Sequence, residues 1–347
     1  MASRKRGEQA KIVGNRPGLR HVSPCGCPAR PVRRVDHPTF LPIMSILVAG
    51  TIAIDNIKTP HAEGRQLLGG SAAYAALSAS YFHPAVNLLG VVGHDFPAAH
   101  LAMLEARGIN LDGVARSPGE SFTWTGEYLE NMNQRVTHHV AVNVLENWRP
   151  EVPAPLAKAR WVVLANMSPD NQLATLEHCD PDAFVVADTM DLWIAIANER
   201  LHDMLRRIDL LVINESEARE FTGTDNLIVA GARLRAKGPE YVVIKLGEHG
   251  SFLFGGDDHH FFSCAAFPLK EVNDPTGAGD TFLGGLAGHL ASIGAVNPTF
   301  GELKAAIVRG TIMASFTCEA FSTRRLESLG EEEIARRLEL FRLYTSF

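Results

Sequence analysis

Cysteine is scarce in this 347-residue chain, which contains five, and the three beyond residue 30 are far apart in the sequence. An odd number of scattered cysteines argues against a disulfide-stapled scaffold and favours a reducing compartment, so we expect a cytoplasmic protein. Long apolar runs are also missing, and no segment reaches the length that a membrane span requires. These absences exclude disulfide-rich secreted domains and membrane-embedded proteins from the expected classes.

Two common nucleotide-binding signatures are absent as well. The chain has no Gly-x-x-x-x-Gly-Lys-Ser/Thr phosphate loop, and no Gly-x-Gly-x-x-Gly follows its first apolar run. The first absence disfavours the P-loop kinases, and the second disfavours the dinucleotide-dependent oxidoreductases.

Positive charge is confined largely to the beginning of the chain. The net charge is −6, but residues 1–43 carry nine Lys and Arg against two Asp and Glu. The remainder therefore holds 24 basic and 37 acidic residues, a net charge of −13. An acidic body lacks the basic surface that nucleic acids require, so we expect no nucleic-acid partner.

Residues 1–43 differ from the rest in composition, with six prolines and almost no apolar periodicity. Such a segment cannot bury enough surface to offset the entropy of ordering, so we expect a disordered extension. Its arginines also fit a transit peptide. A third interpretation takes Met44 as the native start, because a strand-like run follows it directly. The Cys25-x-Cys27 pair has no second ligand pair nearby and is interpreted as chance.

From residue 44 to residue 347 we expect one α/β domain, because short Val/Ile/Leu-rich runs alternate with amphipathic segments. The predicted strands are Ile46–Ala49, Asn87–Val92, Trp161–Ala165, Phe184–Ala187, Leu210–Ile213, Tyr241–Lys245 and Ser251–Phe254. The predicted helices are Ser71–Phe82, Phe96–Arg107, Leu192–Arg207, Glu215–Thr222, Ile228–Lys237, Gly279–Ser292, Leu303–Phe316 and Glu331–Leu343. This alternation predicts a doubly wound sheet between two helical layers.

One region departs from that alternation. Residues 122–129 and 135–142 are β-rich runs joined by an Asn-rich connection, which predicts a hairpin inserted in the α/β domain. A lid or a contact with another subunit accounts for it, and so does an ordinary edge hairpin. His138 and His139 are adjacent on the predicted strand and should point to opposite faces, so they are not expected to share a metal ion.

The most informative segment is Asn273–Gly285, which reads Asn-Asp-Pro-Thr-Gly-Ala-Gly-Asp-Thr-Phe-Leu-Gly-Gly. Three small residues, Gly277, Ala278 and Gly279, stand where a helix begins, and they leave backbone N–H groups open to a ligand. With the helix dipole, those groups form a site suited to phosphate.

Asp280 lies in the first turn of the same predicted helix. A carboxylate at a phosphate-binding helix start can accept a proton from a hydroxyl that attacks the phosphate. It can equally cap the helix. The residues alone leave these two roles open.

The run from Asp274 to Asp280 and its continuation resemble the C-terminal signature of the PfkB, or ribokinase-like, carbohydrate kinases. The resemblance implies a three-layer α/β/α fold with a small β lid, formed by segments near residues 55–68 and 120–145. It implies ATP-dependent phosphorylation of a small molecule. In this family the segment Gly277–Gly279 corresponds to the anion hole and Asp280 to the catalytic base.

Further matches follow in the family's order and extend the resemblance over residues 45–343. Asp55 after the first strand, and the pair Gly69-Gly70, resemble the segments that hold the phosphate acceptor. Asn214 and Glu217 resemble the Asn-x-x-Glu motif that helps to hold Mg²⁺, through water, and the nucleotide phosphates. The resemblance also implies a nucleotide-binding loop, and its residues here are Lys245, Gly247 and Gly250. A monovalent cation such as K⁺ beside Asp274 is implied by some relatives.

The resemblance does not name the acceptor. Tyr74 stands near a position where many sugar kinases of this family have asparagine, and Trp124 and Tyr128 match no known acceptor signature. We therefore expect a sugar or sugar-like acceptor, with a nucleoside as the alternative on the same fold. A catalytically silent ligand-binding relative is the alternative of another class. The aromatic hairpin suggests a homodimer formed through the lid.

Overall fold

The structure, a computed structural model, describes residues 44–132, 134–256 and 260–346. The chain divides into a unit of residues 1–39 and a unit of residues 40–347. The expectations for residues 1–43, including disorder, the Cys25-x-Cys27 pair and a start at Met44, concern a segment that lies outside the described residues.

A nine-stranded sheet runs through the second unit. Its strands in spatial order are β13 (Phe261–Cys264), β12 (Ser251–Phe254), β11 (Tyr241–Lys245), β10 (Leu210–Asn214), β9 (Phe184–Asp188), β8 (Trp161–Leu164), β1 (Ile46–Ala49), β4 (Val86–Val92) and β5 (Asn110–Arg116). Neighbours from β5 to β11 pair in parallel, whereas β12 and β13 are added antiparallel at one edge.

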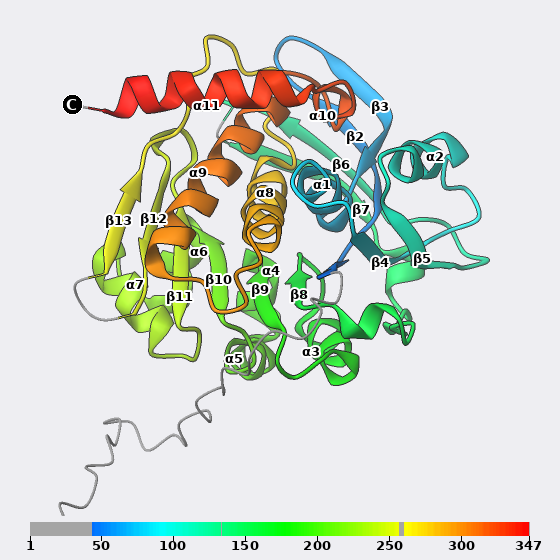
Figure 1. The fold of residues 1–347 in the computed structure, drawn as a ribbon. Coiled ribbons are helices and arrows are strands. Elements are labelled where there is room, and N and C mark those ends of the chain that lie inside the picture. Colours follow the sequence, from blue (N-terminus) through cyan, green and yellow to red (C-terminus); the bar gives the residue numbers. More distant parts are fainter. Residues whose placement is uncertain (1–43, 133, 257–259, 347) are drawn as a thin grey trace, which may run out of the picture. The chain divides into compact units, whose positions relative to one another are not determined.

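Helices cover both faces of this sheet (Figure 1). One face packs against α1 (Ser71–Ala79), α2 (Ala98–Ala106), α8 (Ala278–Ser292), α9 (Phe300–Thr317), α10 (Arg324–Glu327) and α11 (Glu331–Thr345). The other packs against α3 (Pro169–His178), α4 (Asp191–Ile196), α5 (Asn198–Leu205), α6 (Glu215–Thr222) and α7 (Leu227–Arg235). The predicted three-layer α/β/α architecture is confirmed.

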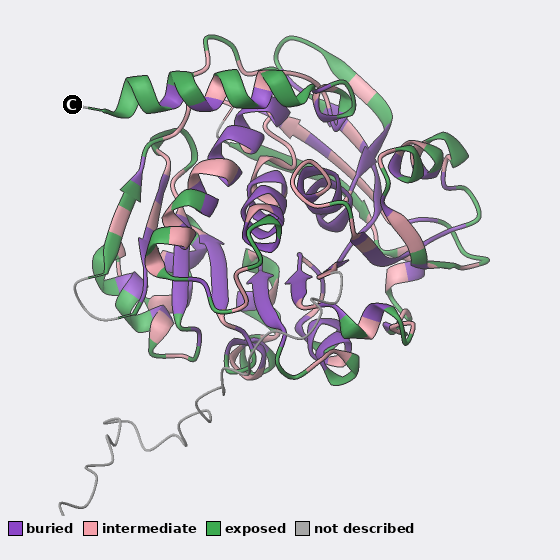
Figure 2. Ribbon diagram, in the orientation of Figure 1, coloured by how far each residue is buried: buried purple, intermediate pink, exposed green. Residues whose placement is uncertain are grey.

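Alternation along the strands explains the two layers. In β1, Ile46 and Val48 belong to the core on the α1/α8 side, whereas Leu47 and Ala49 belong to the core on the opposite side. Successive side chains of a strand point to opposite faces, so a continuous apolar run fills both cores at once. Figure 2 shows these central strands as the buried part of the fold.

A second sheet of four strands, here called the lid sheet, contains β3 (Glu63–Gly69), β2 (Ala53–Lys58), β6 (Thr123–Tyr128) and β7 (Arg135–Ala141) in that order. The predicted hairpin is present as the antiparallel pair β6–β7. Its strands contribute Tyr128 to a small core with Ile57 and Leu67. A bulge near Gly126 interrupts the alternation expected for His138 and His139, because Thr125 pairs with His139 and Gly126 with Thr137.

The helix predicted over 192–207 is instead two helices, α4 and α5. The chain leaves helical geometry at Ala197, where φ is −132° and ψ is 33°. At the break, the side-chain amide of Asn198 donates to the backbone carbonyl of Ile194 at 3.1 Å. The apolar periodicity continues across the break, so the sequence pattern did not reveal it.

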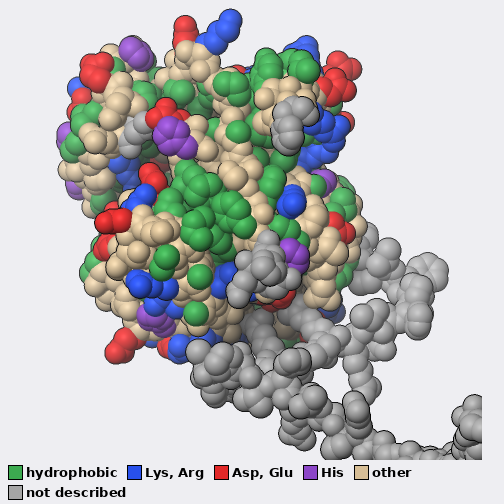
Figure 3. Space-filling view, turned by 90° about the vertical axis from the view of Figure 1, so that its left-hand side faces the viewer, with side chains coloured by type: hydrophobic (Ala, Val, Ile, Leu, Met, Phe, Trp, Pro, Cys, Tyr) green, Lys and Arg blue, Asp and Glu red, His purple; other side chains and the backbone are tan. Residues whose placement is uncertain are grey.

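The β13 edge of the large sheet carries aromatic side chains. The rings of Phe252, Phe254 and Phe261 pack against one another, and Phe261 remains 42% exposed. Figure 3 views this side of the molecule and shows hydrophobic side chains gathered near its middle. None of the helices that the structure describes is both long enough and apolar enough to cross a membrane.

Candidate active site

The first turn of α8 presents uncapped backbone N–H groups. Gly277 is the N-cap of this helix with φ of 75°, and no side chain caps it. A Cβ on Gly277 would lie 2.4 Å from the ring of Tyr74, so both the backbone angle and the space require glycine. No side chain caps the predicted anion-hole segment Gly277–Gly279, although the Ala278 amide donates to the carbonyl of Pro275 at 3.1 Å. A helix N-terminus without a side-chain cap is a site that suits anions.

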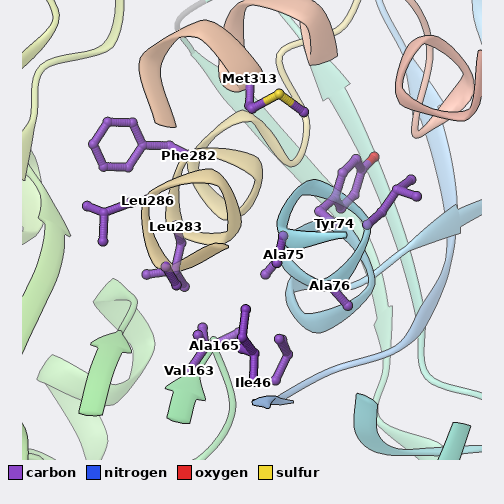
Figure 4. Close-up of a cluster of buried hydrophobic side chains, with 14 of the residues drawn as sticks. Ile46, Tyr74, Ala75, Ala76, Val163, Ala165, Phe282, Leu283, Leu286 and Met313 are labelled. Carbon is purple, nitrogen blue, oxygen red and sulfur yellow. The ribbon is translucent and has the colours of Figure 1, made fainter. Parts of the chain in front are cut away.

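The ring of Tyr74 packs against this glycine turn. It lies on the side of α1 facing away from Ile46 and Ala165 (Figure 4), and it is 1% exposed. Burial raises the pKa of its hydroxyl well above the usual value, and the nearby Asp55 carboxylate adds to the effect. Tyr74 thus acts as packing beneath the glycine turn rather than as an open polar contact for an acceptor.

Asp280 lies in the first turn of α8, beside the uncapped amides. Burial and the nearby Asp188 carboxylate raise its pKa to about 6, while the cations Lys245 and Arg135 oppose the rise. A carboxyl group with a pKa near 6 is ionised at neutral pH but can still accept a proton. The geometry is therefore compatible with the base role implied by the resemblance.

Three parallel strands bring further charged groups to the same end of the sheet. Lys245 ends β11, and its amine pairs with Asp188, the last residue of β9, at 3.1 Å. A Cβ placed on Gly279 would lie 3.0 Å from that amine, so Lys245 reaches the start of α8. Although burial lowers the pKa of Lys245, the carboxylates of Asp188, Glu217 and Asp280 outweigh burial and raise it overall.

Asn214 and Glu217 form a capping box at the start of α6. The Asn214 side chain accepts from the Glu217 amide at 2.9 Å, and the Glu217 carboxylate accepts from the Asn214 amide at 3.0 Å. Burial and the neighbouring Asp188 raise the pKa of Glu217 to about 7. The Asn-x-x-Glu spacing therefore has a structural reason of its own, namely helix capping.

Asp55 projects from β2 toward the same region. It is 4% exposed and packs closely on Gly69, where a Cβ would lie 2.1 Å from the Asp55 carboxyl carbon. Burial raises its pKa to about 8, and the carboxylates of Asp274 and Asp280 contribute. Gly70, with φ of 91°, then forms the N-cap of α1. The structure thus brings the predicted acceptor residues within electrostatic reach of Asp280.

Asp274 is fully buried and holds two loops together. Its carboxylate accepts from the amide of Thr276 at 2.9 Å and from the amide of Ser322 at 3.0 Å. Burial raises its pKa despite these hydrogen bonds. The glycine turn is therefore fixed to the segment that follows α9.

The predicted nucleotide loop follows Lys245 directly. Gly247 and Gly250 flank a short 3₁₀ turn between β11 and β12, with φ of 57° and 95°. Glycine is required at Gly250, where a Cβ would overlap the carbonyl oxygen of Cys264.

Sequence reasoning missed two polar groups near this end of the sheet. Asn166 follows β8, where its side-chain oxygen accepts from the indole of Trp193 at 2.9 Å. Arg135, at the start of β7, is close enough to Asp280 to oppose the rise in its pKa. The position of Asn166 after a predicted strand was an available signal, but Arg135 lies in a hairpin with no acceptor signature.

The arrangement does not itself form a metal site. In the part of the chain that the structure describes, no three His, Cys, Asp or Glu side chains are placed to hold a metal ion. A divalent cation would therefore need ligands from water and from nucleotide phosphates in addition to the chain. The carboxylates of Glu217 and Asp188 are the oxygen donors that suit Mg²⁺ in this way.

Comparison with curated proteins finds relatives among the small-molecule kinases. The chain is 29% identical over 254 residues to the cytidine kinase of Thermococcus kodakarensis, covering 71% of this chain and 89% of that protein.

Comparison with solved structures finds the same fold. The nucleoside kinase of Methanocaldococcus jannaschii, described as an archaeal member of the ribokinase family, matches with a TM-score of 0.69 and 19% identity, over 86% of this chain and 98% of that chain. The ribokinase of Giardia lamblia matches with a TM-score of 0.71 and 18% identity, over 84% and 99%. At these identities the likeness shows the ribokinase-like fold.

Comparison with protein families matches residues 46–328, most of the chain, to the pfkB family of carbohydrate kinases. The match includes the glycine turn, Asp280 and the lid sheet. The chain therefore belongs to the PfkB family of carbohydrate kinases and is an ATP-dependent phosphotransferase.

Proposed function

We propose that this enzyme transfers the γ-phosphoryl group of ATP to a hydroxyl of a sugar or sugar-like small molecule. The observation that carries the proposal is the uncapped start of α8, with Asp280 in its first turn and a pKa raised to about 6 by burial. An anion site and a proton acceptor then lie side by side, as phosphoryl transfer to an alcohol requires.

In the proposed reaction the acceptor oxygen attacks the γ-phosphorus and its proton passes to the Asp280 carboxylate. The bond between the γ-phosphorus and the bridging oxygen breaks, and ADP leaves. The backbone N–H groups of the Gly277–Gly279 segment stabilise the negative charge that develops on the phosphoryl oxygens. Asp55, packed on Gly69, holds an acceptor hydroxyl, and Gly70 sets the start of α1 behind it.

The nucleotide is proposed to lie along the ends of β10 and β11, beside Asn214, Lys245, Gly247 and Gly250. Mg²⁺ supplies charge neutralisation of the ATP phosphates when it is bound. Glu217 is buried in the capping box and would hold the ion through water. Each carboxylate oxygen of Asp274 accepts one amide and keeps a second lone pair, so a monovalent cation such as K⁺ fits beside it.

A nucleoside is the second candidate acceptor. Two observations favour it: the likeness to a cytidine kinase, and Trp124 on the same face of the lid sheet as Asp55, where an indole ring can stack on a base.

The sparse cysteines remain the reason for proposing a cytoplasmic enzyme. Both faces of β7 are exposed, which leaves this edge of the lid sheet open to a second copy of the chain.

The test is release of ADP from Mg²⁺-ATP with a panel of sugars, sugar phosphates and nucleosides, with and without K⁺. Asp280→Asn should lower kcat by ~10²-fold or more, as expected for a lost general base, with little change in the KM for ATP. Asp112→Asn, an exposed position in β5, is the matched control and should leave turnover unchanged. Near-full turnover in Asp280→Asn would contradict the assignment, and activity on sugars alone would remove the nucleoside alternative.

A further inference from the structure

The two faces of the lid sheet differ in chemistry. Cross-strand neighbours share a face, and residues two apart in one strand share it as well. On one face Glu127 binds both neighbouring cations, with Lys58 at 2.7 Å and His138 at 2.9 Å. On the other face Tyr128 is the direct cross-strand partner of Arg135.

The face with Tyr128 is turned toward the start of α8. The hydroxyl of Tyr128 accepts from the hydroxyl of Thr276 at 3.3 Å, and Thr276 belongs to the loop that leads into Gly277. Asp55 lies on this face as well, because it pairs in register with Trp124, four residues before Tyr128. A side chain that shares this face therefore looks toward the proposed reaction centre.

Arg135 carries a charge that is not neutralised. Among the residues that the structure describes, no carboxylate forms an ion pair with it, and its guanidinium lies 6.0 Å from the centre of the Trp124 ring. Burial raises the pKa of Tyr128, and the Arg135 charge acts in the opposite direction. Arg135 also opposes the rise in the pKa of Asp280. The geometry agrees, because Arg135 is the cross-strand partner of Tyr128, whose hydroxyl contacts Thr276 in the loop before Gly277.

The site needs such a charge. The carboxylates of Asp188 and Asp280 lie near the place proposed for the phosphates, and the nearby Lys245 amine is already paired with Asp188. A transferring phosphoryl group brings further negative charge. A guanidinium that forms no ion pair with a described carboxylate is well suited to it, because its planar donors match phosphate oxygens two at a time.

We propose that Arg135 is a catalytic residue, supplied by the lid sheet, that binds the γ-phosphoryl oxygens of ATP during transfer. The inference rests on the proposed function. While the acceptor oxygen forms its bond to phosphorus and ADP departs, the guanidinium donates to the equatorial oxygens and Asp280 takes the acceptor proton. The lid sheet thus contributes to the chemistry as well as to enclosing the acceptor.

The experiment compares wild type, Arg135→Gln, Arg135→Lys and the control Arg65→Gln. Arg65 lies in β3 of the same sheet, is exposed, and pairs with Glu63 at 2.6 Å. Two measurements are made: kcat and both KM values with the acceptor found in the screen, and equilibrium binding of Mg²⁺-ADP with and without aluminium fluoride, which mimics the transferring group.

Arg135→Gln should lower kcat by ~10²-fold or more, within the range known for arginines that stabilise phosphoryl transfer. It should leave the binding of ADP alone within about threefold and abolish the gain that aluminium fluoride gives. Lysine should restore part of the turnover because it keeps the charge but loses the paired donors. Arg65→Gln should match wild type in both measurements.

Wild-type kcat in Arg135→Gln, with aluminium fluoride binding intact, would overturn the inference while leaving the proposed function standing. A rise only in the KM for the acceptor would also overturn it, since Arg135 would then bind the acceptor. A wild-type enzyme without turnover on any acceptor would overturn the proposed function, and the inference with it.

Discussion

Replacing Asp55 with asparagine should make the protein more stable while weakening its activity. Asp55 is buried, and among the described residues no cation pairs with it; the charges that act on it are the carboxylates of Asp274 and Asp280. Ionised aspartate is therefore poorly tolerated at this position. Asparagine has nearly the same shape and carries no charge, so the substitution removes the unfavourable ionisation without opening a cavity.

The size of the effect follows from the pKa. Burial and the two carboxylates raise the pKa of Asp55 from 3.8 to about 8 in the folded protein. Between about pH 4 and pH 8 the folded state holds a proton that the unfolded state has lost, so stability falls as the pH rises through this window. At about 1.4 kcal/mol per unit, the penalty is on the order of 2 kcal/mol at pH 5 and 4 kcal/mol at pH 7.

Urea unfolding of wild type and Asp55→Asn at pH 5, 6, 7 and 8 measures this penalty. The difference in unfolding free energy should favour the variant and should widen with pH up to about pH 8, while Asp112→Asn should show no such trend. The variant should also have a KM for the acceptor raised by at least about tenfold, as expected for a lost hydrogen bond to substrate. A stability difference that does not depend on pH, or that favours wild type, would refute the reasoning.

Two further predictions concern the first turn of α8. Because the pKa of Asp280 is raised to about 6 and a base must be ionised, kcat/KM should fall about tenfold per pH unit below about pH 6. Lys245→Met removes a cation that lowers the pKa of Asp280, so the fall in kcat/KM should begin at a higher pH in this variant. Measuring kcat/KM against pH for wild type and Lys245→Met checks both expectations. Gly277→Ala forces a side chain into a φ of 75° and against Tyr74, so it should lower the melting temperature and kcat together, as thermal unfolding and ADP release would show; a stable, active variant would contradict the tight packing.

Much of the architecture could be predicted from the sequence because the buried parallel strands have an unambiguous pattern. Runs such as Leu210–Ile213 are apolar throughout, and the structure places this one inside the sheet, in β10. Edge elements were harder. The strand Asn110–Arg116 is polar and pairs on one side only, and its sequence does not alternate clearly.

The helix Pro169–His178 was also missed, although its start is marked by Ser168 as N-cap and Pro169 at the first position. Its low apolar content hid it, because several polar residues on this helix are buried by hydrogen bonds rather than by apolar packing. Gln172 is an example, since its amide donates to the carbonyl of Asp188 at 2.9 Å.

The sequence predicts those parts of the candidate site that lie within one short motif. It does not predict the parts that strands distant in the sequence bring together. The glycine turn and Asp280 are contiguous, so their spacing alone indicates the anion site. The ion pair of Lys245 with Asp188 joins residues 57 positions apart, and only the parallel pairing of β9, β10 and β11 brings them together. Arg135 depends on a strand register that no short motif specifies.

The backbones of α1 and α8 pack unusually closely against each other. A Cβ on Gly284 would lie 2.0 Å from the carbonyl oxygen of Ala75, and Ser78 donates to the carbonyl of Thr281 at 2.7 Å, so the two helices meet backbone to backbone. All nine residues of α1 are buried. Helices joined in this way shift as one body, and the first turn of α8 keeps its position against the sheet.

The inner strands of the lid sheet are anchored to that body, because Ile54 and Leu68 belong to the core beside α1, whereas the outer strand β7 is exposed on both faces. Substitutions in the exposed part of the lid sheet can therefore change which acceptor binds without disturbing the glycine turn proposed to bind the phosphate. The choice of acceptor and the transfer of the phosphoryl group therefore depend on different parts of the fold, and each can change during evolution without the other.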